Sequence, residues 1–246
     1  MSVYKNESER IAEILKNSSH AVFFGGAGVS TDCGIPDFRG NGGLYKNGGA
    51  GNEYFLSREC LDLEPERFFE FYRENMIFDG VSPCEAHNSL ARLEQRGIIK
   101  TVITQNIDGL HQAAGSCNVI ELHGKSRVCY CMKCRTEYGV SHIAKADGIP
   151  TCNRCGGVVR PDVTLYGEAL DGMSFREAAY EIESADVLIV GGTSLTVNPA
   201  ASMVEYFTGE HFIIVNMSET PYDDWAEYVI RRPITEFFEE VEKHIG

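Results

Sequence analysis

Residues 22–28 hold the feature that most constrains the fold of this chain. An apolar run, VFF at 22–24, is typical of a short buried strand, and GGAG at 25–28 follows it at once. Only residues with small or absent side chains stand in this second run, so the backbone there can approach another group closely. In nucleotide-binding α/β folds, a strand that ends in glycines and leads into a helix presents free backbone N–H groups to a phosphate.

The same stretch disfavours a hydride-transfer enzyme. Gly26 and Gly28 would need a third glycine at position 31 to complete the usual dinucleotide fingerprint, and Thr31 stands there. No acidic residue ends a clear second strand about 20 residues further on, where a dehydrogenase binds the ribose. We therefore expect a nucleotide site that serves another chemistry.

Three later segments place polar residues next to glycines or at the ends of apolar runs. Residues 34–40 read GIPDFRG, a composition typical of a shaped loop over a ligand. The apolar run 98–104 leads into QNIDGLH at 105–111, and the run 119–122 ends at His123-Gly124. Ligands of open parallel sheets bind beyond the carboxyl ends of strands, so we expect these residues to share one edge. An imidazole there has an ordinary pKa of about 6.5 and suits a base near neutral pH.

Four cysteines predict a structural zinc site. The pairs Cys131-x-x-Cys134 and Cys152-x-x-Cys155 are separated by 17 residues, a spacing typical of four-thiolate zinc modules. Because sulfur would fill all four tetrahedral positions, the zinc would stabilise its module and take no part in catalysis. Cys129 could compete in register, although a Cys-x-Cys pair fits zinc less well.

Composition limits the partners and the location. A net charge of −14 argues against nucleic acid and anionic membranes as partners and favours a basic one, such as a lysine-rich peptide. No apolar run approaches the length of a membrane span, and MSVYKNESER lacks the apolar core of a signal peptide. Nine cysteines, an odd number, also fit a secreted disulfide framework poorly. We therefore expect a cytoplasmic protein.

The alternation of strand and helix patterns from residue 21 onward predicts an α/β fold with a doubly wound parallel sheet. In addition, GAG at 26–28, GIPDFRG, TQNIDGLH, the HG pair and the paired cysteines resemble, in order, the sirtuin family of NAD-dependent protein deacylases. The resemblance extends over nearly the whole chain.

The resemblance implies a Rossmann-like sheet into which a small zinc ribbon and a helical module are inserted. The NAD-binding domain would comprise 1–39, 81–124 and 160–246, the helical or loop module 40–80, and the zinc-ribbon module 125–159. Six glycines between 40 and 51 favour a loop that closes on the cofactor.

The resemblance also assigns the site residues. His123 and Asn106 would be catalytic, with His123 acting as general base through the ribose hydroxyls. The NAD-binding residues would be Ala27, Thr31, Phe38, Arg39, Gln105, Ile107, Asp108, Thr193, Ser194 and Asn216. The acetyl-lysine peptide would contact Thr164, Tyr166, Gly167 and Val197, and the structural zinc would be held by Cys131, Cys134, Cys152 and Cys155.

The implied reaction is protein-lysine deacetylation. The amide oxygen of the acyl-lysine would attack C1′ of the nicotinamide ribose as nicotinamide leaves, and O-acetyl-ADP-ribose would form. Relatives that remove acidic acyl groups use a Tyr-x-x-Arg pair where this chain has Phe69 and Tyr72, although Arg73 is only one residue away. We therefore expect neutral acyl groups to be preferred, acetyl first.

Three other functions remain open at this stage. A mono-ADP-ribosyltransferase or a longer-chain deacylase could use the same pocket. A catalytically silent NAD or zinc adaptor is disfavoured, because Asn106, Asp108 and His123 are present together.

Cys33, Thr164 and Asn198 depart from the residues that the family usually carries at these positions.

Overall fold

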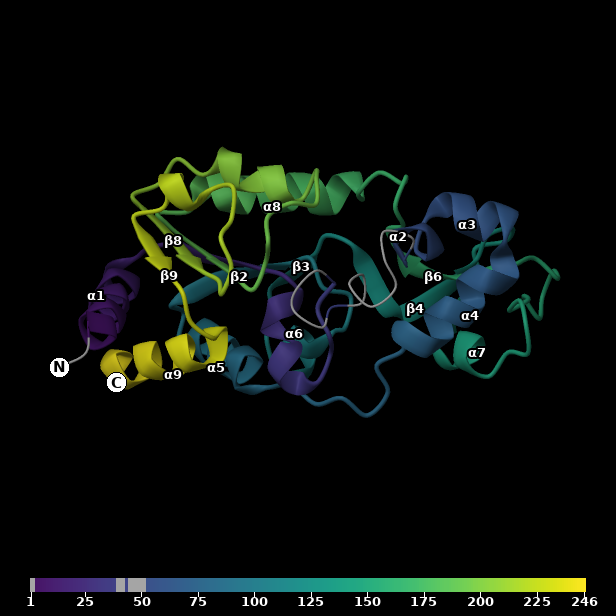
Figure 1. Cartoon of the computed structure of the whole chain (residues 1–246), viewed down its shortest axis with the longest axis horizontal. Helices are drawn as coiled ribbons and strands as arrows, with labels where there is room; N and C mark the ends of the chain where they lie inside the picture. The colour runs from purple at the N-terminus through teal and green to yellow at the C-terminus, as the bar shows by residue number, and fades with distance from the viewer. Residues whose placement is uncertain (1–2, 39–42, 44–51) are drawn as a thin grey trace.

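The computed structural model describes residues 3–38, 43 and 52–246. Figure 1 shows an elongated molecule in which a large sheet flanked by helices lies beside a smaller module of helices and strands. The loop expected at 40–51, apart from residue 43, and the candidate ligand Arg39 lie outside the described residues. No helix within the described chain is long and apolar enough to cross a membrane.

The larger sheet has six strands that all run parallel. Its strands are β1 (Ala21–Gly25), β2 (Ile99–Thr104), β3 (Val119–Glu121), β7 (Val187–Gly191), β8 (His211–Val215) and β9 (Tyr228–Ile230). They lie in the order β3-β2-β1-β7-β8-β9, with each neighbouring pair in parallel register. This is the strand order of dinucleotide-binding folds, in which ligands bind where the order reverses, here between β1 and β7. The predicted doubly wound sheet is confirmed.

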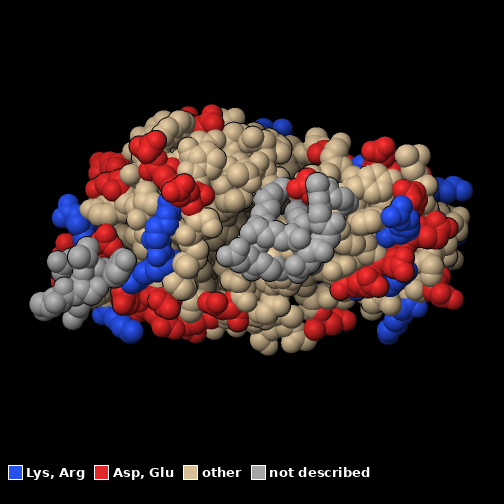
Figure 2. All heavy atoms as spheres, viewed as in Figure 1, with Lys and Arg blue, Asp and Glu red and all other residues tan. Residues whose placement is uncertain are grey.

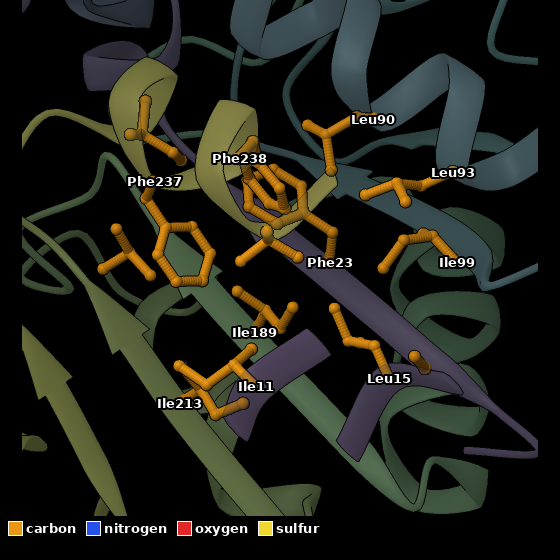
Figure 3. Close-up of a cluster of buried hydrophobic side chains, with 14 of the residues drawn as sticks. Ile11, Leu15, Phe23, Leu90, Leu93, Ile99, Ile189, Ile213, Phe237 and Phe238 are labelled. Atoms are coloured by element: carbon orange, nitrogen blue, oxygen red, sulfur yellow. The ribbon is translucent and has the colours of Figure 1, made fainter. Parts of the chain in front are cut away.

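Helices cover both faces of this sheet. Its flanking helices are α1 (Val3–Asn17), α5 (Glu85–Gln95), α6 (Leu110–Ala113), α8 (Gly172–Ser184) and α9 (Ile234–Ile245), and a 3₁₀ segment, η4, spans Ala201–Tyr206. On one face, α1, α5 and α9 bury Leu15, Leu90 and Phe238 against Phe23 of β1 (Figure 3). The rings of Phe23 and Phe238 meet edge to face, with centroids 5.6 Å apart.

The opposite face explains why β1 reads as an unbroken apolar run. Phe24 and Val22 point away from Phe23 into a second cluster, where α8 contributes Ile182 and η4 contributes Met203. Strands buried on both faces lose the alternation of apolar and polar residues that a half-exposed strand shows. Both faces therefore stabilise the sheet by burying apolar area.

The smaller module has a separate sheet and a separate core. Its strands, β4 (Gly124–Cys131), β5 (Glu137–Gly139) and β6 (Val159–Val163), pair antiparallel in the order β5-β4-β6. Its helices are α2 (Asn52–Phe55), α3 (Arg58–Leu63), α4 (Pro65–Asn75) and α7 (Ser141–Ala144). One apolar cluster joins Phe68 and Phe69 of α4 to Ile143 of α7 and Val159 of β6. The helical segment and the cysteine-bearing strands thus share one core, while the exact limits of the predicted domains stay a proposal.

Candidate active site

A cavity of about 620 Å³ lies at the carboxyl ends of the large sheet, where the strand order reverses. This volume is typical of small-molecule sites. All predicted catalytic, NAD-binding and peptide-binding residues within the described chain line the cavity. Helix α4 and its neighbours contribute an apolar wall of Leu56, Tyr72, Met76 and Phe78. The structure therefore brings the predicted residues together, while the role of each one stays a proposal.

The glycine run lets two loops cross at the floor of the cavity. The backbone N–H of Gly28 donates a hydrogen bond of 2.8 Å to the carbonyl of Gly192, which follows β7. A Cβ atom on Gly28 would lie 2.8 Å from the Cα of Gly192, closer than real side chains approach. Gly192 itself has a φ of +62°, in the left-handed region that favours glycine. Glycine at position 28 thus allows the two loops to touch, and the neighbouring Ala27 lines the cavity.

The loop after β2 is fixed by a polar network around Ser30. The Ser30 hydroxyl donates to Asp108 Oδ2 at 2.7 Å and accepts from Asn106 Nδ2 at 3.1 Å. Gln105 Nε2 donates to Thr193 Oγ1 at 3.0 Å, which ties this loop to the loop after β7. Sequence reasoning missed Ser30, whose only signal was its position directly after the GAG segment and Val29.

The His123 side chain lines the same cavity, and its Nε2 atom is the ring nitrogen that can accept a proton. Its Nδ1 lies 2.8 Å from the carbonyl oxygen of Gln105, so Nδ1–H donates there and Nε2 keeps its lone pair. Burial lowers the pKa of His123 below its ordinary value, although the Gln105 carbonyl raises it in part. The imidazole is therefore neutral at pH 7 and can accept a proton.

Gly124 allows the chain to turn directly after His123. Its φ is +81°, and a Cβ atom there would lie 2.2 Å from the carbonyl oxygen of Asp162 on β6. The Thr164 N–H donates to the carbonyl of His123 at 2.9 Å. The HG pair thus holds the histidine against the strand that precedes the predicted peptide-contacting residues.

A buried ion pair shapes the turn at Gly167. Arg160 is 2% exposed, and its guanidinium contacts both carboxylate oxygens of Glu168, at 2.5 and 2.9 Å. Glu168 also accepts a hydrogen bond from the N–H of Leu165 at 3.0 Å. Burial raises the pKa of Glu168, but these bonds outweigh it and hold the pKa below its ordinary value. The chain from 164 to 168 is therefore fixed along one wall of the cavity.

The positions considered for an acidic acyl group offer no cation in the described structure. Phe69 and Tyr72 are fully buried, and the Tyr72 hydroxyl has no hydrogen-bond partner within the described residues. Arg73 turns to the cysteine-bearing part, where its Nη1 donates to the carbonyl of Gly148 at 2.9 Å. The cavity wall formed by α4 is thus apolar, which supports the expected preference for neutral acyl groups.

The four paired cysteines converge in the smaller module. Neighbouring sulfurs lie 3.5 Å apart for Cys131 and Cys155, 3.6 Å for Cys134 and Cys152, and 3.3 Å for Cys155 and Cys134. Zinc–sulfur bonds of about 2.3 Å in a tetrahedron would place sulfurs about 3.8 Å apart, so the four thiolates fit a zinc ion. Cys129 is fully buried but takes no part in the group of four sulfurs. The sequence had disfavoured Cys129 as a ligand, because a Cys-x-Cys pair fits zinc less well.

The fold and the cavity together define a nucleotide-binding α/β enzyme with a structural zinc module. The model of the Sir2 family matches residues 26–199, and the chain therefore belongs to the Sir2 family, the sirtuins.

Among its relatives, an "NAD-dependent protein deacetylase" of Clostridium acetobutylicum is 48% identical over 94% of this chain and 96% of its own length. A solved Sir2 structure with p53 peptide and NAD⁺ is 38% identical, has a TM-score of 0.87, and covers 95% of this chain and 96% of its own. Another, of a Sir2 variant with deacetylated p53 peptide and 3′-O-acetyl ADP ribose, is 38% identical with a TM-score of 0.90. It covers 96% of this chain and 97% of its own.

Proposed function

We propose that this chain is an NAD-dependent protein-lysine deacetylase that releases nicotinamide and forms O-acetyl-ADP-ribose. The observation that carries the proposal is the position of His123, a neutral imidazole in the same cavity as the Asn106–Asp108 loop. The printed names of the relatives and the ligands of the solved Sir2 structures support the same reaction.

Three groups of residues have separate tasks in this proposal. The phosphates and the nicotinamide ribose are bound by Ala27, Thr31, Phe38 and Arg39. The adenosine half is held by Thr193, Ser194 and Asn216. Gln105, Asn106, Ile107 and Asp108 form the nicotinamide pocket. NAD supplies the electrophilic ribose carbon and the leaving nicotinamide. His123 accepts the ribose hydroxyl proton at Nε2 while Nδ1–H stays bonded to Gln105, so the ring keeps its orientation during proton transfer.

The peptide binds along Thr164, Tyr166, Gly167 and Val197, with its acetyl-lysine directed at the cavity. Acidic side chains are spread over both ends of the face in Figure 2, and the net charge is −14. This charge favours a lysine-rich protein as the partner and disfavours nucleic acid and membranes. A cytoplasmic location is part of the same proposal.

Two rival activities use the same pocket. A longer-chain deacylase is favoured by the apolar wall of Leu56, Tyr72 and Met76, which could accommodate a longer neutral chain. Mono-ADP-ribosyl transfer would need only NAD and another nucleophile. Comparing acetyl, butyryl and succinyl peptides tests the first rival, and labelling of protein by NAD without peptide tests the second.

Nicotinamide release from NAD tests the proposal, measured with an acetyl-lysine peptide, the same peptide unmodified, or none. We expect release only with the acetylated peptide, and a loss of about 10²-fold or more in His123→Ala because a general base is removed. His211→Ala is the matched control, since His211 begins β8 at the amino ends of the strands and does not line the cavity. Release that is independent of peptide, or unaffected by His123→Ala, contradicts the proposal.

A further inference from the structure

A second group of metal-binding side chains lies behind the Ser30 network. Cys33 ends the 3₁₀ segment η2 (Thr31–Cys33), Cys84 precedes α5, and His87 lies in the first turn of α5. Their potential ligand atoms all lie within 4.8 Å of one another. None of the three lines the cavity described above, so the group is separate from the nucleotide site.

The distances match the edges of a zinc tetrahedron. His87 Nδ1 lies 3.2 Å from Cys84 Sγ and 3.6 Å from Cys33 Sγ. Zinc bonds of about 2.3 Å to sulfur and about 2.0 Å to nitrogen would place S and N about 3.5 Å apart. The three ligands would therefore need only small movements to bind a metal.

Hydrogen bonding sets the histidine tautomer that a metal requires. The Ser30 hydroxyl gives its only proton to Asp108, so it can serve His87 Nε2, 3.4 Å away, only as an acceptor. His87 Nε2 therefore carries the hydrogen, and the bare Nδ1 faces the two sulfurs. Metal-binding histidines generally donate their other N–H to a fixed acceptor in this way.

The backbone holds the group in place. The Cys84 N–H donates to Cys33 Sγ at 3.1 Å, and the Cys84 thiol donates to the carbonyl of Val29 at 3.2 Å. His87 is fully buried, and the ring of His111 packs against it with centroids 4.7 Å apart. The Val29 carbonyl or a water molecule could complete four-coordination, since both are oxygen donors.

We propose that Cys33, Cys84 and His87 form a second metal site, for Zn²⁺ or a similar borderline-soft divalent cation, distinct from the four-cysteine site. Binding replaces the two thiol protons, which are released to solvent, by two metal–sulfur bonds and one metal–nitrogen bond. His87 then connects the metal through Ser30 to Asp108 and Asn106 of the nicotinamide pocket. A polarised His87 N–H would hold Ser30 more firmly on Asp108, so metal binding should slow nicotinamide release; this consequence rests on the proposed function.

Metal stoichiometry tests the site without relying on activity. Purified protein is equilibrated with Zn²⁺ under a phosphine reductant, dialysed, and its zinc content measured for wild type, Cys33→Ala and Cys84→Ala. Cys117→Ala is the matched control, because Cys117 is an exposed thiol outside both groups. We expect a second zinc in wild type and the control, and its loss in both cluster variants with the four-cysteine zinc retained.

Cobalt distinguishes the site from adventitious surface binding. Co²⁺ added to protein that carries only its first zinc should produce thiolate-to-metal charge-transfer absorption in wild type and Cys117→Ala, and none in Cys84→Ala. Circular dichroism of each variant confirms that it is folded. A single zinc in wild type, or a second zinc that persists in the Cys33→Ala/Cys84→Ala double variant, overturns the site.

The coupling to the nicotinamide pocket has its own readout. Metal bound at the second site should reduce the rate of peptide-dependent nicotinamide release about fivefold in wild type. The same metal concentration should leave the rate of Cys84→Ala unchanged. An unchanged rate at measured full occupancy overturns the coupling. If the protein released no nicotinamide under any condition, the proposed function would fail while the zinc and cobalt results still decided the metal site.

Discussion

The two parts of the molecule are stabilised by different means. The six-stranded sheet buries large apolar clusters on both faces, with Phe23 on one side and Phe24 on the other. The smaller module has three short strands, one apolar cluster and four converging thiolates. Small cores bury too little apolar area to be stable on their own, and metal ligation adds the stabilising free energy that they lack. The cavity is lined by both parts, so activity depends on both kinds of stabilisation.

The largest effect is expected from removing zinc from the smaller module. Structural zinc contributes about 10–16 kcal/mol in small zinc modules, so Cys152→Ser should unfold residues 124–163 and abolish peptide-dependent activity. Hydrogen exchange should show lost protection in β4–β6 and retained protection in β1, β7 and β8. Cys117→Ser, at an exposed thiol, is the control. Unchanged protection of β4–β6 in zinc-free protein would contradict the comparison.

A core truncation in the larger part should show the opposite pattern. Phe238→Ala removes a fully buried ring that packs on Phe23 and should cost about 3–5 kcal/mol of unfolding free energy. Urea denaturation measures the loss, and the zinc content of the folded protein should stay at the wild-type value. A cost below about 1 kcal/mol would show that the apolar cluster is not the source of stability.

The ion pair at the junction of the two parts should have a smaller effect. Glu168→Gln leaves the Arg160 guanidinium buried without its carboxylate partner. We expect the free energy of unfolding to fall by about 2–3 kcal/mol and the KM for the peptide to rise. Glu177→Gln, an exposed glutamate on α8, is the matched control. Equal stability of the two variants would exclude a structural role for the pair.

The smallest expected effect is a shift in the pH dependence of the activity. Only the neutral form of His123 accepts a proton, so activity should be present above its pKa and fall as the pH drops through it. Because burial lowers the pKa of His123 below 6.5, the acid limb of kcat/KM should have its midpoint below pH 6.5. A midpoint above 6.5 would mean that a different group, or a charged imidazole, controls the rate.

Sequence reasoning succeeded where the pattern is local. The apolar runs at 22–24 and 98–104 predicted β1 and β2, because buried parallel strands are continuously apolar. The cysteine spacing predicted the group of four sulfurs, because ligand geometry fixes the spacing within each pair.

What sequence reasoning missed depends on contacts between distant segments. Ser30 gains its importance only because the fold places it between Asp108 and His87, and no local pattern encodes that meeting. Cys33 and Cys84 likewise lie far apart in the chain and match no known ligand spacing. The shared core of α4 and the cysteine-bearing strands was also invisible, because a helical apolar face does not identify its partner.

The central claim is that the acetyl group leaves lysine for ADP-ribose in this cavity. Mass spectrometry of a reaction with NAD and an acetyl-lysine peptide tests it most directly, with nicotinamide, deacetylated peptide and acetyl-ADP-ribose quantified together. We predict that the three products form in equal amounts and that His123→Ala forms each of them about 10²-fold or more slowly. Nicotinamide accompanied by free ADP-ribose or by ADP-ribosylated protein, with the acetyl group still on the peptide, would contradict the account.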